Sequence, residues 1–247
     1  MLESVVIIGY GVVGQNLHKE LKALDPDIKD KYKVEVNRFG RDHYDFGFIC
    51  VDTPLVCGEL DITEVKNAIS ETNCDIYIIK STIPVGTISN LIKETGKHIV
   101  FSPEYYGGTQ HCNNYKYDFT ILGGDRIDCN KVVDILNRCY DGRHIFRIVD
   151  SELAELVKFM ENSWIATKVS FCTEFNSVCN KLGIDYNELR ELFVLDPRVS
   201  PSHTFVFKDK PYWDSHCLNK DVVSVANQFD MDLLKQIVKY NDDQKSK

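Results

Sequence analysis

One long helix is predicted by residues 150–183, DSELAELVKFMENSWIATKVSFCTEFNSVCNKLG. Asp150 or Ser151 can cap its start, and Gly183 can end it. A first apolar stripe repeats every three or four positions, with Thr167 as the one lapse: Leu153, Val157, Met160, Trp164, Phe171, Phe175, Val178 and Leu182. A second stripe beside it contains Ala154, Ile165, Val169 and Cys172. Because a helix that is apolar over so wide an arc is usually buried between partners, we expect this helix to organise a domain.

Two polar residues fall within the second stripe. Lys158 and Asn162 are one turn apart and therefore share a face of the helix. The lysine stem can pack in the core while its ammonium reaches water. Alternatively, the lysine and the amide belong to a functional site. The spacing alone does not choose between these interpretations.

Composition excludes several classes of protein. The 247 residues, 43% of them hydrophobic, suffice for a large domain with a core. The net charge of −8 argues against a nucleic-acid partner, and no apolar run reaches the ~18 residues of a membrane span. The N-terminal MLESVVIIG is too short and too acidic for a signal peptide. Nine cysteines, an odd number without a CxxC pair, indicate reduced thiols in a cytoplasmic protein and no metal site.

The N-terminal segment predicts a dinucleotide site. An apolar strand at residues 4–9 enters GYGVVG, residues 9–14, and an amphipathic helix follows. In a G-x-G-x-x-G motif the first glycine permits a tight turn, and the second lets a pyrophosphate approach the backbone. The third lets the helix pack on the strand. The candidate cofactor-binding residues are Gly9, Tyr10, Gly11, Val12, Val13 and Gly14.

A second strand is predicted at residues 33–37, KVEVN. A dinucleotide fold usually places an acid at the end of this strand, where it binds the ribose hydroxyls. This chain has Asn37, then Arg38 and, nearby, Arg41. Asn37 and Arg38 can accept the 2′-phosphate of NADP, or Arg38 can stack on adenine or face solvent. These residues therefore leave both cofactors open, and we expect NAD, with NADP as the alternative.

Strands and helices alternate through the first 150 residues. Further strands are predicted at 45–52, 75–82, 98–104, 119–124 and 143–149. Ligands of such sheets bind beyond the carboxyl ends of the strands, and the residues at that edge are Thr53, Pro54, Ser81, Thr82 and Glu104. We predict an α/β fold: a Rossmann-like, doubly wound parallel sheet at 1–150, then an all-α domain at 151–247 built on the long helix. A last helical region is expected at 221–240.

Six motifs, in order, resemble those of the UDP-glucose/GDP-mannose dehydrogenase family. They are GYGVVG, VDTP at 51–54, STIPVGT at 81–87, SPEYYGG at 102–108, Lys158-x-x-x-Asn162 and Cys217-Leu-Asn-Lys220-Asp221. Any one motif can arise by chance, but six in family order over almost the whole chain do not. The resemblance implies a UDP-glucose 6-dehydrogenase-like enzyme that oxidises a sugar primary alcohol to the acid in two NAD(P)-dependent steps.

The resemblance also implies a set of catalytic residues. Cys217 matches a nucleophile that captures the aldehyde as a thiohemiacetal and then becomes a thioester. Lys158 matches the lysine that stabilises oxyanion charge, and Asn162 is a neutral donor beside it. The remaining matches are Asp221 with the carboxylate linked to the active-site water, Glu104 with the acid at the sheet edge, and Thr82 with a water-holding hydroxyl.

Binding residues and partners follow from the same resemblance. The expected cofactor contacts are Thr53, Pro54, Ser81, Thr82 and Lys220. The expected substrate contacts are Glu104, Tyr105, Tyr106, Lys158, Asn162, Arg198 and Cys217. Arg198 is the loosest match, because its family counterpart sometimes reaches the sugar nucleotide across a dimer. The resemblance further implies a homodimer through the long helix and a nucleotide-sugar substrate, UDP-glucose first among them.

The chain also departs from the family pattern. It stops at Lys247, where a second nucleotide-clasping domain would begin, and a helix and strand after the second strand are nearly absent. The second acid of the glutamate loop is replaced at about Gly108. The glycine-rich run before the cysteine is replaced by Tyr212, Trp213, Asp214, Ser215 and His216. These changes leave the sugar and its nucleotide undetermined.

Three functions therefore remain open. The first is a two-step nucleotide-sugar dehydrogenase that uses Cys217. The second is a catalytically silent protein that binds a dinucleotide or a nucleotide sugar as a decoy, sensor or assembly subunit. The third is a single-step dehydrogenase of a small hydroxy acid, in which Lys158 and Asn162 act without the thiol.

Overall fold

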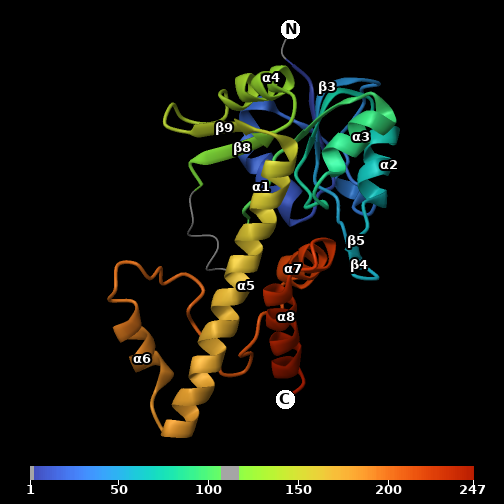
Figure 1. Ribbon diagram of the computed structural model, residues 1–247. Coiled ribbons are helices and arrows are strands. Elements are labelled where there is room, and N and C mark those ends of the chain that lie inside the picture. Colours follow the sequence, from blue (N-terminus) through green and yellow to red (C-terminus); the bar gives the residue numbers. More distant parts are fainter. Residues whose placement is uncertain (1–2, 107–116) are drawn as a thin grey trace. The chain divides into compact units, whose positions relative to one another are not determined.

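The computed structural model of the chain describes residues 3–106 and 117–247. These residues pack into two compact units. Unit 1 comprises Met1–Pro54 and Asp61–Lys158, and unit 2 comprises Leu55–Leu60 and Phe159–Lys247. The long helix α5, Ser151–Leu182, begins in unit 1 and ends in unit 2 (Figure 1).

Unit 1 is built on a seven-stranded sheet with the strand order β2-β1-β3-β6-β7-β8-β9. The strands are β1 Val5–Ile8, β2 Asp27–Lys29, β3 Tyr44–Ile49, β6 Cys74–Ile79, β7 His98–Phe101, β8 Phe119–Gly123 and β9 Ile145–Val149. Every pairing is parallel except that of β7 with β8, which is antiparallel at Phe101 and Gly123. The predicted α/β class with a Rossmann-like, mainly parallel sheet is confirmed.

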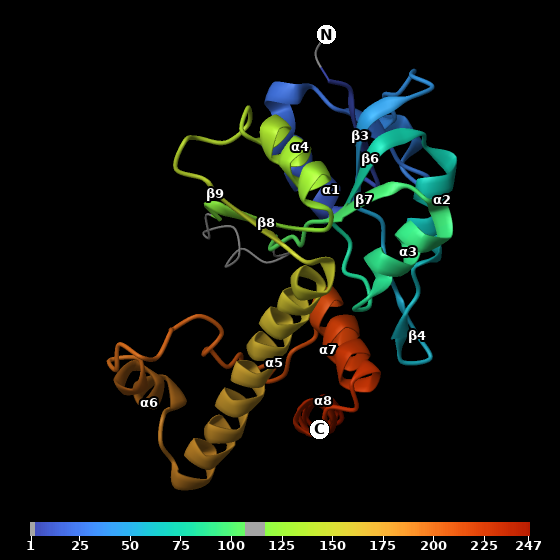
Figure 2. The same cartoon turned by 45° about the horizontal axis from the view of Figure 1, so that its top comes forward.

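Helices cover both faces of this sheet (Figure 2). They are α1 Val12–Glu20, α2 Thr63–Glu71, α3 Thr87–Thr95 and α4 Arg126–Leu136. Val5 and Ile7 of β1 belong to the core formed with α1 and α4, whereas Val6 and Ile8 belong to the core formed with α2 and α3. Both faces of the central strands are buried, which explains why these strands read as continuous apolar runs.

The second strand is not where the sequence analysis placed it. The strand β2 lies at Asp27–Lys29, and residues 34–36 form one turn of 3₁₀ helix. Of these two segments, β2 places a side chain in the core: Ile28 is buried, whereas Val34 is exposed. The alternation of apolar and polar residues in KVEVN therefore did not mark a half-buried strand.

Unit 2 consists of the rest of α5, three further helices and a short hairpin. The elements are β4 Leu55–Val56, β5 Glu59–Leu60, α6 Tyr186–Phe193, α7 His216–Gln228 and α8 Asp232–Lys245. The helical region expected at 221–240 consists of two helices. Asp230, which lies between them, has a φ of +52° and so interrupts the helical backbone. The first helix begins earlier than expected, since Ser215 caps it: the Ser215 hydroxyl accepts the N–H of Leu218 at 3.1 Å.

The two apolar stripes of α5 differ in burial. In the second stripe Ala154 and Cys172 are buried. In the first stripe the exposed residues are Leu153, Met160, Trp164, Phe171, Phe175, Val178 and Leu182. Met160 is 73% exposed and Trp164 60% exposed. The described part of one chain therefore covers one stripe of this helix and leaves the other open to solvent.

Candidate active site

The glycine turn joins β1 to α1. Gly9 has a φ of +93°, and a Cβ there would lie 2.7 Å from the carbonyl oxygen of Cys50. A Cβ at Gly14 would lie 2.0 Å from the carbonyl oxygen of Gly9, so α1 can approach the turn only with glycine at this position. The space beside Gly11 is open, and no side chain caps the start of α1. The N–H groups of this turn can therefore receive a pyrophosphate.

An acid that the sequence analysis missed follows β2. The carboxylate of Asp30 accepts the N–H groups of Tyr10 at 2.5 Å, Lys33 at 2.6 Å and Tyr32 at 2.8 Å. Burial raises the pKa of Asp30, but these three donors outweigh it and hold the pKa below its ordinary value. Asp30 occupies the position of the ribose-binding acid in a dinucleotide fold. Its spacing of about 20 residues from the glycine motif would have revealed it.

Asn37 and Arg38, predicted as cofactor contacts, hold the segment around β2. The amide of Asn37 accepts the N–H of Asp30 at 2.6 Å and donates to its carbonyl at 3.1 Å. The guanidinium of Arg38 pairs with Asp25 at 2.6 Å and lies 3.7 Å from Asp27. Asn37 therefore positions Asp30, whereas Arg38 is engaged by two carboxylates near the edge of the sheet.

Hydroxyl groups tie together the loops that follow β3 and β6. Thr53 Oγ1 donates to the carbonyl of Thr82 at 2.8 Å, and Ser81 Oγ donates to the carbonyl of Val51 at 2.6 Å. Pro54 follows Thr53 directly. Ser81 and Thr82 are both buried. These four predicted residues lie at the carboxyl edge of the sheet, where ligands of this fold class bind.

Lys158 is buried beside Glu104. Its ammonium Nζ lies 3.9 Å from Glu104 Oε1 and 5.1 Å from the centre of the Tyr105 ring. Because Lys158 is only 4% exposed, its head does not reach water, and the snorkelling interpretation is wrong. Unit 1 thus holds a carboxylate and an ammonium together, with an aromatic ring beside the ammonium.

Tyr106 contributes its backbone rather than its ring to this cluster. Its N–H donates to Glu104 Oε2 at 2.7 Å and so fixes the carboxylate. Burial, and then the negative charge of Glu20, raise the pKa of the Tyr106 phenol well above its ordinary value. The hydroxyl of Tyr106 therefore serves Glu20 in the interior of unit 1, and the prediction that Tyr106 contacts substrate receives no support from its side chain.

Lys80, a buried residue that the sequence analysis did not consider, holds this cluster in place. The ammonium of Lys80 donates to Ser102 Oγ at 3.1 Å and to the carbonyl of Pro103 at 3.4 Å, just before Glu104. Burial lowers the pKa of Lys80. Lys80 directly follows the apolar strand β6, and a charged residue at that position could have indicated a functional or structural role from the sequence.

Glu155 secures the first turns of α5. Its carboxylate accepts the N–H of Gly86 at 2.6 Å and that of Ile88 at 2.9 Å, at the start of α3. Burial raises the pKa of Glu155 to about 7, although the two N–H donors act in the opposite direction. Because Lys158 lies three residues further along α5, this anchor also sets the position from which Lys158 extends.

In unit 2 the site residues contact one another through their side chains. Asn162 Nδ2 donates to Asp221 Oδ2 at 2.6 Å, and Lys220 Nζ donates to Asp221 Oδ1 at 2.7 Å. Asp221 is 1% exposed. Lys220, predicted as a cofactor contact, thus neutralises Asp221. Asp221 in turn orients the amide of Asn162, one helical turn after Lys158.

Cys217 stands in the first turn of α7 and is half-buried. The N–H groups at the start of a helix stabilise negative charge, which favours a thiolate over a thiol. Asp221 follows four residues later, on the same face of α7. Helix α7 therefore carries both the predicted nucleophile and the predicted carboxylate.

The remaining predicted residues are either peripheral or outside the described residues. Arg198 lies in a surface turn after α6, where its guanidinium pairs with Asp196 at 2.6 Å. Its side chain is 88% exposed. The end of the SPEYYGG motif, including Gly108, lies outside the described residues.

The helical part of the chain is similar to a known protein domain. Residues 152–243 match the central domain of the UDP-glucose/GDP-mannose dehydrogenase family. This part of the chain belongs to that family. The segment of this chain that matches the family contains Lys158, Asn162, Cys217, Lys220 and Asp221.

Individual relatives extend the similarity into unit 1. The chain is 29% identical over 219 residues to the UDP-glucose 6-dehydrogenase of Rickettsia bellii, a match that covers 81% of this chain and 49% of the relative. It is 27% identical over 246 residues to the UDP-N-acetyl-D-mannosamine dehydrogenase of Methanocaldococcus jannaschii, covering 88% and 56%. The chain thus spans about half the length of these curated dehydrogenases.

A solved structure supports the fold. The UDP-glucose dehydrogenase of Pyrobaculum islandicum superposes with a TM-score of 0.81 at 20% identity. The superposition covers 98% of this chain and 68% of that one. Both units therefore have counterparts in a nucleotide-sugar dehydrogenase.

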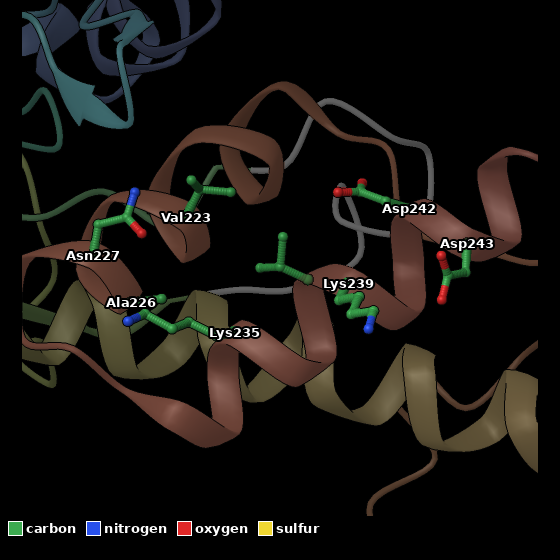
Figure 3. A pocket seen from close by; sticks show the side chains of 8 residues that line it. Val223, Ala226, Asn227, Lys235, Lys239, Asp242 and Asp243 are labelled. Atoms are coloured by element: carbon green, nitrogen blue, oxygen red, sulfur yellow. The ribbon is translucent and has the colours of Figure 1, made fainter.

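A separate pocket lies between α7 and α8 in unit 2 (Figure 3). Its volume is about 260 Å³, and it is lined by Val223, Ala226, Asn227, Lys235, Val238, Lys239, Asp242 and Asp243. Lysines and aspartates balance in this lining, and Lys235 is already paired with Asp230. None of the predicted site residues lines this pocket. Its balanced charge gives no preference for a phosphate.

Among residues 3–106 and 117–247, no helix is both long enough and apolar enough to cross a bilayer.

Proposed function

We propose that this chain is a nucleotide-sugar 6-dehydrogenase that oxidises a primary alcohol to the acid in two NAD-dependent steps through Cys217. The observation that carries the proposal is the buried Asn162–Asp221–Lys220 network, one turn after Cys217 on α7. Burial of an ion pair is costly without a compensating role, and this one orients the amide of Asn162 from a carboxylate one helical turn after the candidate nucleophile. The named relatives that act on nucleotide sugars support the same conclusion.

The residues around the glycine turn fit NAD. The open N-terminus of α1 suits a pyrophosphate, and the carboxylate of Asp30 suits the ribose hydroxyls. A 2′-phosphate would be repelled by Asp30, and Arg38 is occupied by Asp25. We therefore favour NAD over NADP. Bound NAD would supply the hydride acceptor in both oxidations.

In the first oxidation, the chain's own residues manage the proton and the developing negative charge. As the sugar hydroxyl loses its proton, the ammonium of Lys158 would stabilise the alkoxide, and Asn162 would add a neutral N–H donor. Glu104, 3.9 Å from Lys158 Nζ, would take the proton directly or through a water held by Thr82. Hydride loss then leaves an aldehyde.

In the second oxidation, the sulfur of Cys217 would attack the aldehyde carbon. A C–S bond forms, and the carbonyl oxygen takes a proton to give a thiohemiacetal. Loss of a second hydride and of the hydroxyl proton yields a thioester, which water cleaves to the acid and the thiol. Asp221, whose carboxylate lies 2.7 Å from the ammonium of Lys220, would orient that water and accept its proton.

The decisive experiment measures the reduced cofactor formed per sugar with UDP-glucose as substrate. Wild-type protein should form two reduced cofactors per sugar. Cys217→Ser should lose acid formation by at least about a thousandfold, because a serine hydroxyl is a far weaker nucleophile than a thiolate. Cys57→Ser, which removes an exposed thiol at the tip of the β4–β5 hairpin, is the matched control and should retain both steps.

Two outcomes would favour the other candidate functions. Full activity of Cys217→Ser on a small hydroxy acid would indicate a single-step dehydrogenase. Tight binding of NAD without turnover of UDP-glucose, GDP-mannose or UDP-N-acetylmannosamine would indicate a silent binding protein.

We further propose that the exposed stripe of α5 binds a second copy of this chain. Its apolar residues recur with the spacing of a helix–helix seam over most of α5. A helix of this length, paired with its own copy, would bury rings such as Trp164 and Phe171. Light scattering at micromolar concentration should give a dimer, and Trp164→Glu with Phe171→Glu should give a folded monomer. A wild-type monomer would exclude this assembly.

A further inference from the structure

The segment that leads into Cys217 is held by a helix distant in sequence. Asn241, on α8, accepts the backbone N–H of Trp213 at 3.0 Å and donates to the backbone carbonyl of Trp213 at 3.0 Å. Asn241 is 1% exposed. One amide side chain thus satisfies both backbone groups of a residue four positions before the candidate nucleophile.

The side chain of Trp213 is fixed as firmly as its backbone. Its indole Nε1 donates to Ser170 Oγ on α5 at 3.0 Å, and the ring packs in the cluster of Ala166, Leu218 and Val222. A buried tryptophan with a satisfied N–H contributes both contact area and a defined orientation. Trp213 is therefore anchored from α5, α7 and α8.

A second anchor lies between Trp213 and Cys217. Ser215 caps α7, and Asp214 accepts a hydrogen bond from Asn219 at 2.7 Å and pairs with Lys210 at 3.0 Å. Each residue from Trp213 to Ser215 therefore makes a specific contact.

We propose that Asn241 is a positioning residue for Cys217: by clamping Trp213, it fixes the lead into α7 so that the thiolate meets the aldehyde in one geometry. The inference rests on the proposed function. Capture of an aldehyde requires the sulfur to approach the carbonyl carbon closely and at an obtuse angle to the C=O bond, and a misplacement of about 1 Å costs roughly a hundredfold. The hydrogen bonds of Asn241 to Trp213 hold the backbone that sets this approach.

The test compares Asn241→Leu with wild type in a Cys57→Ser background. Leucine keeps the branched outline of asparagine but leaves both backbone groups of Trp213 unpaired. Alkylation of Cys217 by iodoacetamide, followed by peptide mass spectrometry, should slow about tenfold, because a frayed helix start stabilises the thiolate less. With a nucleotide sugar, the reduced cofactor per sugar should fall from two toward one, with release of aldehyde.

Two further variants separate positioning from general stability. Asn227, at the other end of α7, also donates a side-chain hydrogen bond to a backbone carbonyl, that of Gly58. Asn227→Leu removes this hydrogen bond and should leave the alkylation rate within twofold. Ser170→Ala removes only the indole partner and, should Asn241→Leu not fold, still reports on the clamp with an expected threefold slowing. Alkylation that is unchanged or faster in both Asn241→Leu and Ser170→Ala would overturn the proposal.

These readouts distinguish the inference from the function on which it rests. Alkylation of Cys217 needs no substrate, so it tests the clamp even if no sugar is oxidised. A wild-type protein without turnover would contradict the proposed function. Slower alkylation in Asn241→Leu, in that same case, would still support the clamp. If turnover occurs and both oxidations slow equally with two cofactors still reduced per sugar, Asn241 does not act through Cys217.

Discussion

The two units hold their site residues by different means. In unit 1 the carboxylates of Asp30 and Glu155 and the hydroxyl of Thr53 are bonded to backbone groups. In unit 2 the carboxylate of Asp221 is bonded to the side chains of Asn162 and Lys220. A backbone partner is supplied by the fold itself, whereas a side-chain partner is lost with a single substitution. Substitutions in unit 2 should therefore be coupled, and those in unit 1 should be nearly independent.

The largest expected effect tests the coupling in unit 2. Asp221→Asn should lower the free energy of unfolding by about 3 kcal/mol, because the buried ammonium of Lys220 loses its counter-charge. Adding Lys220→Met should restore at least half of this loss, since the buried ammonium that lost its counter-charge is then removed as well. Urea denaturation of both variants measures the two values. Simple addition of the single effects would contradict the comparison between the units.

A smaller effect concerns the pH dependence of unit 1. Glu155 has a folded-state pKa of about 7 against an ordinary value of 4.5, so folding favours its protonated form. Its stabilising contribution is therefore complete below pH 4.5 and is lost as the pH rises through 7. Relative to Glu155→Gln, wild type should lose about 2 kcal/mol of unfolding free energy between pH 5 and pH 8.

Urea denaturation at the two pH values measures this difference. Glu152→Gln is the matched control: the hydroxyl of Ser89 lowers the pKa of Glu152, so no loss of this sign is expected there. An equal difference between wild type and Glu155→Gln at both pH values would show that the Glu155 carboxylate is ionised throughout.

The smallest expected effect is a change in the preference for one cofactor over the other. Asp30→Asn retains an oxygen for the backbone donors but removes the charge, so the preference for NAD over NADP should fall about tenfold. Arg38→Ala is the control, since Arg38 pairs with exposed Asp25, and the preference should stay within twofold. Binding constants for both cofactors measure the change. A collapse of NADP binding in Arg38→Ala would restore the phosphate-binding interpretation of Asn37 and Arg38.

Some of the site residues in unit 1 could be placed from the sequence, and others could not. Residues that directly follow apolar strands, such as Thr53 and Thr82, were located correctly at the edge of the sheet. The second strand was misplaced because KVEVN alternates like a strand, while the true strand β2 spans three residues. Asp30 was lost with it. A three-residue strand carries too little periodicity to be recognised without its pairing partner β1.

The sequence by itself determined the glycine turn, the run of the long helix, and the helical spacing that puts Lys158 beside Asn162 and Cys217 beside Asp221. Each of these depends on residues a few positions apart, where backbone geometry alone sets the relationship. The tertiary structure decided which side chains meet: Asn162 finds Asp221 across 59 residues, and Trp213 finds Asn241 across 28. It also decided which stripe of α5 is covered. Such pairings depend on how separate elements pack, and no local pattern in either partner specifies the other.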